Sequence, residues 1–238
     1  MNRRALLIVG LLVAAAAGAA FFFLSGRSTS RSVRVMQWIR ASAVHQEWAI
    51  QAGGRCEDAP FSYPTNGFIG FLWDDSFRPG HRHSGLDIFG GKDVGETPVV
   101  AAYDGYLTRL SDWKSTVIVR IPEDPLQSGR QIWTYYTHMA DSQGNSFIDS
   151  AFPPGTTEQF VTAGTLLGTQ GNYSGTAGNP TGVHLHFSIV RDDGSGKFLN
   201  ELEIGNTIDP SPYFGLSLNA AQVDSGYIPI CQLESAGD

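Results

Sequence analysis

The sequence predicts a mainly β fold: a compact domain built as an antiparallel β-sheet or sandwich, preceded by one hydrophobic N-terminal helix. Charged residues make up only 16% of the 238 residues, whereas 28 glycines and an aromatic content of 11% favour a turn-rich protein. From about residue 60 onward, short apolar runs are broken by Gly, Pro and Asp, with no helical pattern between them. Frequent strands without intervening helices are typical of antiparallel sheets and sandwiches.

The N-terminal helix is predicted from residues 5–24, an uncharged apolar run of 20 residues. Because this length matches one crossing of a bilayer, we expect an uncleaved membrane anchor. The alternative is a signal peptide cleaved near residues 17–19, where Ala-Gly-Ala offers small side chains. Either segment places the domain outside the cytoplasm, membrane-anchored in the first case and secreted in the second. Arginines lie on both sides of the run, so flanking charge does not determine its orientation.

Three segments follow from this pattern. Residues 1–31 form the anchor or signal and a polar linker, residues 32–55 a juxtamembrane helical spacer, and residues 56–238 the β domain. Apolar residues recur in the spacer at a loosely helical spacing among arginines. The spacer is either a basic amphipathic helix beside a membrane or a helix without a partner. Its apolar residues are Val33, Met36, Ile39, Val44 and Trp48.

Within the domain, residues 98–102 and 106–110 are expected to form a hairpin. The turn Asp104-Gly105 joins them, and Asp-Gly tolerates the backbone conformation that a tight turn needs. Further strands are expected over residues 117–121, 131–138 and 183–190.

The charges argue against nucleic acid as a partner. The chain has 16 basic and 23 acidic residues, for a net charge of −7. The first 46 residues contain six arginines and no acidic residue, so the domain that follows is more acidic than the net charge suggests. An acidic domain does not attract a polyphosphate backbone.

The two cysteines, Cys56 and Cys231, lie near the two ends of the domain. In an exported protein such a pair predicts a disulfide. Closing so long a loop contributes up to ~5 kcal/mol in the chain-entropy model. The alternative is two buried free thiols.

Four of the six histidines occur in three short patterns: His83 four residues before Asp87, His138 at the end of an expected strand, and His184-Leu185-His186 within another. Alternation along a strand puts both histidines of the last pattern on one face. Two imidazoles and a carboxylate suffice to hold Zn²⁺ and leave a fourth position open, and further histidines nearby are suited to proton transfer.

Each pattern also has a simpler interpretation. His184 and His186, taken alone, are also typical of a polar strand face exposed to water, and His138 of a polar residue that ends a strand. His81 competes with His83 as a ligand if this segment is extended. No H-E-x-x-H occurs, which excludes a helical zinc protease of that type.

The patterns in sequence resemble the lysostaphin/LytM-type zinc endopeptidases. Residues 83–88 (HSGLDI) and 95–105 (GETPVVAAYDG) are similar to that family's H-x-G-x-D and G-T-P-V-x-A-x-x-D-G segments. Residues 136–138 (YTH), 161–168 (VTAGTLLG) and 182–187 (GVHLHF) are similar to its Y-x-H-L, V-x-x-G-x-x-x-G and G-P-H-L-H-F segments. The order and rough spacing match over about residues 65–215.

The resemblance implies a compact antiparallel fold with one Zn²⁺ per chain at the floor of a groove. It implies His83, Asp87 and His186 as zinc ligands and His138 and His184 as catalytic histidines. The implied activity is hydrolysis of peptide bonds in cell-wall peptidoglycan. The alternatives are a catalytically silent wall-binding or amidase-activator module of the same fold, and a zinc peptidase that acts on another exported peptide.

Two departures from the family affect the groove. Val183 stands where the family has proline, and residues 170–182 form a longer loop than the family's glycine turn. Tyr173 is the one large side chain of this loop, so we expect it to contact substrate. The alternative is an extended hairpin tip that makes no substrate contact. The sequence leaves open which bond is cut, which of the two catalytic histidines is the base, and the oligomeric state.

Overall fold

The computed structural model describes residues 31–76 and 80–231. The hydrophobic helix predicted over residues 5–24, with its role as anchor or signal, lies outside the described residues. Within the described ranges, no helix combines the length and apolar character that a membrane crossing requires.

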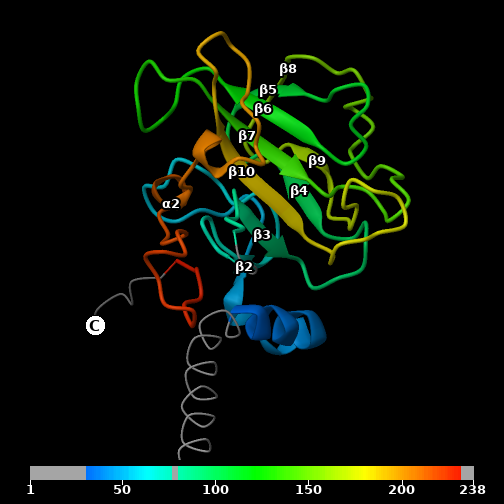
Figure 1. Ribbon diagram of the computed structural model, residues 1–238, viewed down its shortest axis with the longest axis vertical. Coiled ribbons are helices and arrows are strands. Elements are labelled where there is room, and N and C mark those ends of the chain that lie inside the picture. Colours follow the sequence, from blue (N-terminus) through cyan, green and yellow to red (C-terminus); the bar gives the residue numbers. More distant parts are fainter. Residues whose placement is uncertain (1–30, 77–79, 232–238) are drawn as a thin grey trace, which may run out of the picture.

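The mainly antiparallel β prediction is confirmed, since β1 to β11 of the described residues pair with one another only in antiparallel fashion. Figure 1 shows β10 in the middle of the main sheet, between β3 and β7. In spatial order the main sheet consists of β1 (Ala49–Ile50), β2 (Gly67–Phe71), β3 (Leu86–Phe89), β10 (Leu185–Arg191), β7 (Ile132–Thr137), β6 (Val117–Ile121), β5 (Gly105–Thr108) and β8 (Gln159–Val161), with β11 (Thr207–Ile208) also pairing with β10.

A second sheet of two strands, β4 (Pro98–Val100) and β9 (Leu166–Thr169), contradicts the hairpin expected across Asp104-Gly105. β4 pairs with β9, whereas β5 pairs with β6 and β8, so the turn carries the chain from one sheet to the other. Gly105 lets its strand approach β6 closely and does not form a hairpin turn, because a Cβ there would lie 2.4 Å from the carbonyl oxygen of Arg120.

The main core lies between the two sheets. Leu185 and Phe187 of β10 belong to the same buried cluster as Val99 of β4 and Leu167 of β9. Each is at most 1% exposed, and burial of such a side chain contributes about 1.5–3 kcal/mol. The alternation expected along residues 183–190 is therefore confirmed within β10: Leu185, Phe187 and Ile189 point into the core, which leaves the histidine face on the other side. Val183 lies before the strand and is not part of the buried cluster.

Within residues 31–76 and 80–231, helical structure is short and lies at the periphery. Residues 31–41 form a helix, drawn in blue in Figure 1, whose Val35 and Trp38 pack against Phe68 and Phe89 of β2 and β3. This helix contacts the sheet directly, and the domain boundary at residue 56 stays a prediction. The remaining helical elements are η1 (Ser42–Val44), η2 (Gln46–Trp48), η3 (Ile204–Asn206) and α2 (Ser211–Phe214).

The predicted disulfide is present. Cys56 and Cys231 are joined across 175 residues of sequence. The hydroxyl group of Tyr63 lies 2.9 Å from the sulfur of Cys56 and 2.8 Å from that of Cys231. The disulfide ties the segment that contains Cys231 to the segment between β1 and β2, which fits a protein of an oxidising compartment.

Candidate metal centre

Two neighbouring strands bring Asp87 and His186 together. In the antiparallel pairing of β3 with β10, these two residues lie directly opposite one another. His83 lies on the segment that leads into β3. This segment crosses close to β10, because a Cβ on Gly85 would lie 2.2 Å from the carbonyl oxygen of Phe187. Glycine at position 85 thus lets His83 approach the strand pair.

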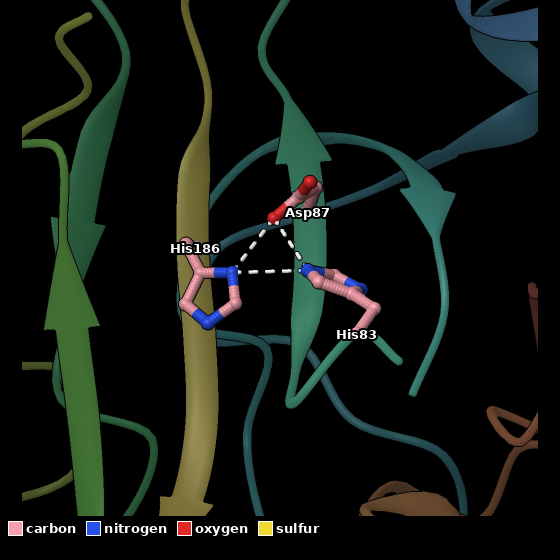
Figure 2. Close-up of side chains that lie close together, drawn as sticks. All are labelled: His83, Asp87 and His186. Carbon is pink, nitrogen blue, oxygen red and sulfur yellow. Dashed lines mark hydrogen bonds and ion pairs between the residues drawn. The ribbon is translucent and has the colours of Figure 1, made fainter. Parts of the chain in front are cut away.

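The side chains of these three residues converge, as Figure 2 shows. Oδ1 of Asp87 lies 3.0 Å from Nε2 of His83 and 2.8 Å from Nδ1 of His186. The two nitrogens lie 3.1 Å apart. All three side chains are buried, with residue exposures of 5–9%. The strand face that carries His184 and His186 is therefore not exposed to water, so that simpler interpretation of the H-x-H pattern is wrong.

Each imidazole has an inner nitrogen that faces Asp87 (Nε2 of His83, Nδ1 of His186) and an outer nitrogen that faces away from it. The hydrogen bond of the outer nitrogen determines whether the inner one carries a lone pair. Nδ1 of His83 donates to the carbonyl oxygen of Leu72 at 2.9 Å, and Nε2 of His186 donates to Glu201 at 2.7 Å. A neutral imidazole with its hydrogen on the outer nitrogen presents a lone pair on the inner one. Two lone pairs and a carboxylate oxygen within about 3 Å repel one another unless a cation lies among them. The geometry therefore calls for positive charge at this point.

The electrostatics of the site favour the same conclusion. Burial lowers the pKa of His186, but Glu201 and Asp87 outweigh it and raise the pKa to about 10. Burial acts to raise the pKa of Asp87, yet the adjoining histidines hold it well below its usual range. The two carboxylates that flank His186 thus favour a positive charge beside it, carried by a proton or by a metal cation.

Zinc fits this donor set. Among residues 31–76 and 80–231, His83, Asp87 and His186 are the group whose ligand atoms lie within 4.8 Å of one another. A tetrahedral zinc ion with bonds of about 2.0–2.1 Å spaces its ligand atoms by about 3.3 Å, close to the separations observed here. His81, the competing candidate, is not part of this group; its ring stacks on that of His83 with centroids 6.5 Å apart.

His138 and His184 lie beside the three-residue group. Their ring centroids are 4.6 Å apart, and Nε2 of His184 lies 3.5 Å from Oδ1 of Asp87. Each outer nitrogen again has an acceptor: Nδ1 of His138 donates to the carbonyl oxygen of Tyr173 at 2.6 Å, and Nδ1 of His184 to that of Gly182 at 2.7 Å. The lone pair of each neutral ring is therefore on Nε2.

Both of these histidines are held neutral. Burial, together with the neighbouring His184 and His186, lowers the pKa of His138 to about 3. Burial also lowers the pKa of His184. Neutral imidazoles accept protons, so this pair has the protonation state that a general base requires.

The backbone at His138 has an unusual conformation. Its φ of 75° lies in the left-handed region that non-glycine residues rarely adopt. The residue follows β7 directly and turns its ring toward His184 instead of ending a strand at the surface. Strained backbone is common at functional sites, and it persists only where the surrounding structure holds it in place. Here the loop of residues 170–182 supplies that support.

This loop packs against the segment that begins at His138. The backbone nitrogens of Asn172 and Tyr173 donate to the carbonyl oxygen of Ala140 at 2.9 and 3.2 Å. The Tyr173 side chain borders the groove but is only 9% exposed, and the amine of Lys114 lies 5.8 Å from its ring. Substrate contact by Tyr173 stays a prediction, and what the structure adds is the bond from His138 to its carbonyl oxygen.

The five residues lie in a groove of about 570 Å³. Its lining also includes Lys114, Thr116, Tyr135, Glu201 and Leu202. Leu202 is 82% exposed, which makes it the most exposed of the large apolar residues in the described ranges.

Glu201 and the backbone carbonyl oxygens that accept hydrogen bonds from the histidines were not predicted from the sequence. Glu201 follows His186 by 15 residues in a glycine-rich loop, where no spacing rule connects it to a metal site. Carbonyl acceptors carry no sequence signal at all. The one available hint was Ser188, which shares the strand face of the histidines and lies 2.9 Å from Nε2 of His186.

Comparison with known proteins gives distant structural likenesses. No protein-family model and no curated protein sequence matches the chain. The structure is similar to the catalytic domain of the antimicrobial peptidase lysostaphin from Staphylococcus simulans, with 19% identity and a TM-score of 0.38 over 66% of this chain and 93% of that chain.

Two further structures are similar at the same level. For Csd3 from Helicobacter pylori the identity is 20% and the TM-score 0.36, over 59% of this chain and only 33% of that chain. For a putative peptidase M23 from Pseudomonas aeruginosa the values are 24% and 0.38, over 76% of this chain and 62% of that chain. These likenesses carry no argument about activity, which has to come from the chemistry of the site.

Proposed function

We propose that this protein is a zinc-dependent endopeptidase that hydrolyses peptide bonds of bacterial cell-wall peptidoglycan, with one Zn²⁺ per chain. The observation that carries the proposal is the arrangement of lone pairs. His83, Asp87 and His186 present three donor atoms within 3.1 Å, while the outer nitrogens of both imidazoles are bound to protein acceptors. Such outer acceptors are typical of histidines that ligate a metal.

In this proposal His83, Asp87 and His186 would hold the zinc ion, which would polarise the scissile carbonyl group and lower the pKa of a water molecule to about 7. His138 and His184 perform the proton transfers. One accepts the proton of the attacking water on Nε2, and once protonated it can return that proton to the departing amine. The other stabilises the negative charge that develops on the carbonyl oxygen only when its Nε2 carries a proton, because the neutral ring presents a lone pair there. Their bonds to the carbonyl oxygens of Tyr173 and Gly182 keep both Nε2 atoms directed at the site.

The substrate is inferred from the motif resemblance and from the groove. Peptidoglycan peptides are extended chains in the cell wall, so only a protein outside the cytoplasm has access to them. The disulfide supports an extracytoplasmic location, and residues 5–24 provide the anchor or, after cleavage, the signal.

The deciding experiment digests purified peptidoglycan with the full-length chain, with and without a chelator, and identifies the products by mass. We expect cleavage of a peptide bond that stops with chelator and returns when Zn²⁺ is added. Binding to the wall material without any cleavage would favour the silent module instead. Cleavage of other exported peptides but not of wall peptides would favour a peptidase of different specificity.

A further inference from the structure

Glu201 lies buried under the zinc-binding histidine although it comes from a surface loop. The loop follows β10 and turns back toward the sheet, and its residue Leu202 is 82% exposed. The residue exposure of Glu201, in contrast, is 8%. A carboxylate is costly to bury without compensating partners, so its contacts require an explanation.

One oxygen atom of Glu201 receives three hydrogen bonds. Oε1 accepts from Nε2 of His186 at 2.7 Å, from the hydroxyl of Ser188 at 2.7 Å and from the hydroxyl of Ser84 at 2.6 Å. Ser188 belongs to β10, and Ser84 to the segment between His83 and β3. The carboxylate thus joins the two chain segments that supply the metal-binding side chains.

Glu201 cannot itself bind the same cation. Nδ1 of His186 faces Asp87 and Nε2 faces Glu201, so the imidazole ring separates the two carboxylates. Glu201 therefore acts through His186. Its negative charge keeps the hydrogen on Nε2, which leaves the lone pair on Nδ1, the atom that faces Asp87 and His83.

We propose that Glu201 is a positioning residue of the metal centre: it sets the tautomer of His186 and strengthens that histidine as a ligand. This role rests on the proposed function, because it requires a metal at His83, Asp87 and His186. Anionic acceptors behind a ligand histidine raise its basicity, and their loss typically lowers metal affinity by about 10- to 100-fold.

The test compares Glu201→Gln with Ser84→Ala in the full-length chain. Both variants remove a feature of the same buried cluster, but only Glu201→Gln removes the negative charge behind His186. Zinc affinity is measured by competition with a chromogenic chelator, and the melting temperature is measured without metal. We expect Glu201→Gln to bind zinc about 10- to 100-fold more weakly. Ser84→Ala should remain within a few-fold of the parent.

A second measurement needs no variant. In the zinc-loaded parent chain, nitrogen NMR of labelled histidine must place the hydrogen of His186 on Nε2; a hydrogen on Nδ1 overturns the proposal. Parental zinc affinity in Glu201→Gln, or an equal loss in Ser84→Ala, also overturns it. These outcomes leave the proposed function intact if Asp87→Ala still loses zinc. A parent chain that binds no zinc overturns the metal centre itself.

Discussion

Gly171 lies between the backbones of the two proposed catalytic histidines, and a single methyl group there should disturb both. Its carbonyl oxygen accepts the backbone N–H of His184 at 3.2 Å. A Cβ at position 171 would lie 2.1 Å from the carbonyl oxygen of Ala140 and 2.5 Å from that of His138. Both contacts are to backbone atoms, which cannot rotate away as a flexible side chain can.

The cost of Gly171→Ala follows from this overlap. An ordinary contact would need at least 3.4 Å, so the loop or the His138 segment must move by about 1 Å. Overpacking of this kind typically costs 1–3 kcal/mol, or about 2–4 °C of melting temperature per kcal/mol in a domain of this size. A 1 Å displacement of a catalytic group lowers the rate by about 10²-fold. The three proposed zinc ligands belong to other segments, so zinc content should not change.

The assay measures kcat on a wall-derived peptide, zinc content and melting temperature for Gly171→Ala. Gly205→Ala is the matched control, since it adds the same methyl group where no atom lies within 4 Å. We expect Gly205→Ala to behave as the parent. Parental rate and melting temperature in Gly171→Ala would refute the close approach. Loss of zinc together with activity would show that the loop acts on the ligands and not on His138.

Further outcomes are expected at the site and at the disulfide. Replacing His83, Asp87 or His186 by Ala should remove most of the zinc and all hydrolysis, and full metal and activity in Asp87→Ala would contradict the ligand assignment. His138→Ala and His184→Ala should each keep zinc and lose about 10²-fold or more in rate; a variant that lost its metal would belong among the ligands. Leu202→Ala should raise KM at unchanged zinc content and melting temperature, because its side chain is 82% exposed at the groove, and an unchanged KM on several peptides would remove it from the substrate contacts. Cys56 and Cys231 should react with thiol reagents only after reduction, so alkylation of the unreduced, unfolded chain would argue against the disulfide.

Local pattern was sufficient for β6, β7 and the two faces of β10. Alternation from Leu185 to Ile189 depends only on the geometry of an extended chain, so it could be predicted from the sequence. Strand pairing depends on contacts between segments that are distant in sequence, and the hairpin predicted from the sequence was wrong. Asp104-Gly105 has the composition of a hairpin turn, yet the flanking strands β4 and β5 belong to different sheets.

The residues proposed to carry the chemistry of this protein could be predicted from the sequence. The motifs containing His83, Asp87, His138, His184 and His186 are short enough to recognise without any knowledge of the fold. Their electrostatic setting was decided by tertiary structure alone. The acceptors that direct the imidazoles are the carbonyl oxygens of Leu72, Tyr173 and Gly182 and the carboxylate of Glu201. A carbonyl oxygen is common to all residues and a distant carboxylate has no fixed spacing, so only the folded chain reveals which of them receive these hydrogen bonds.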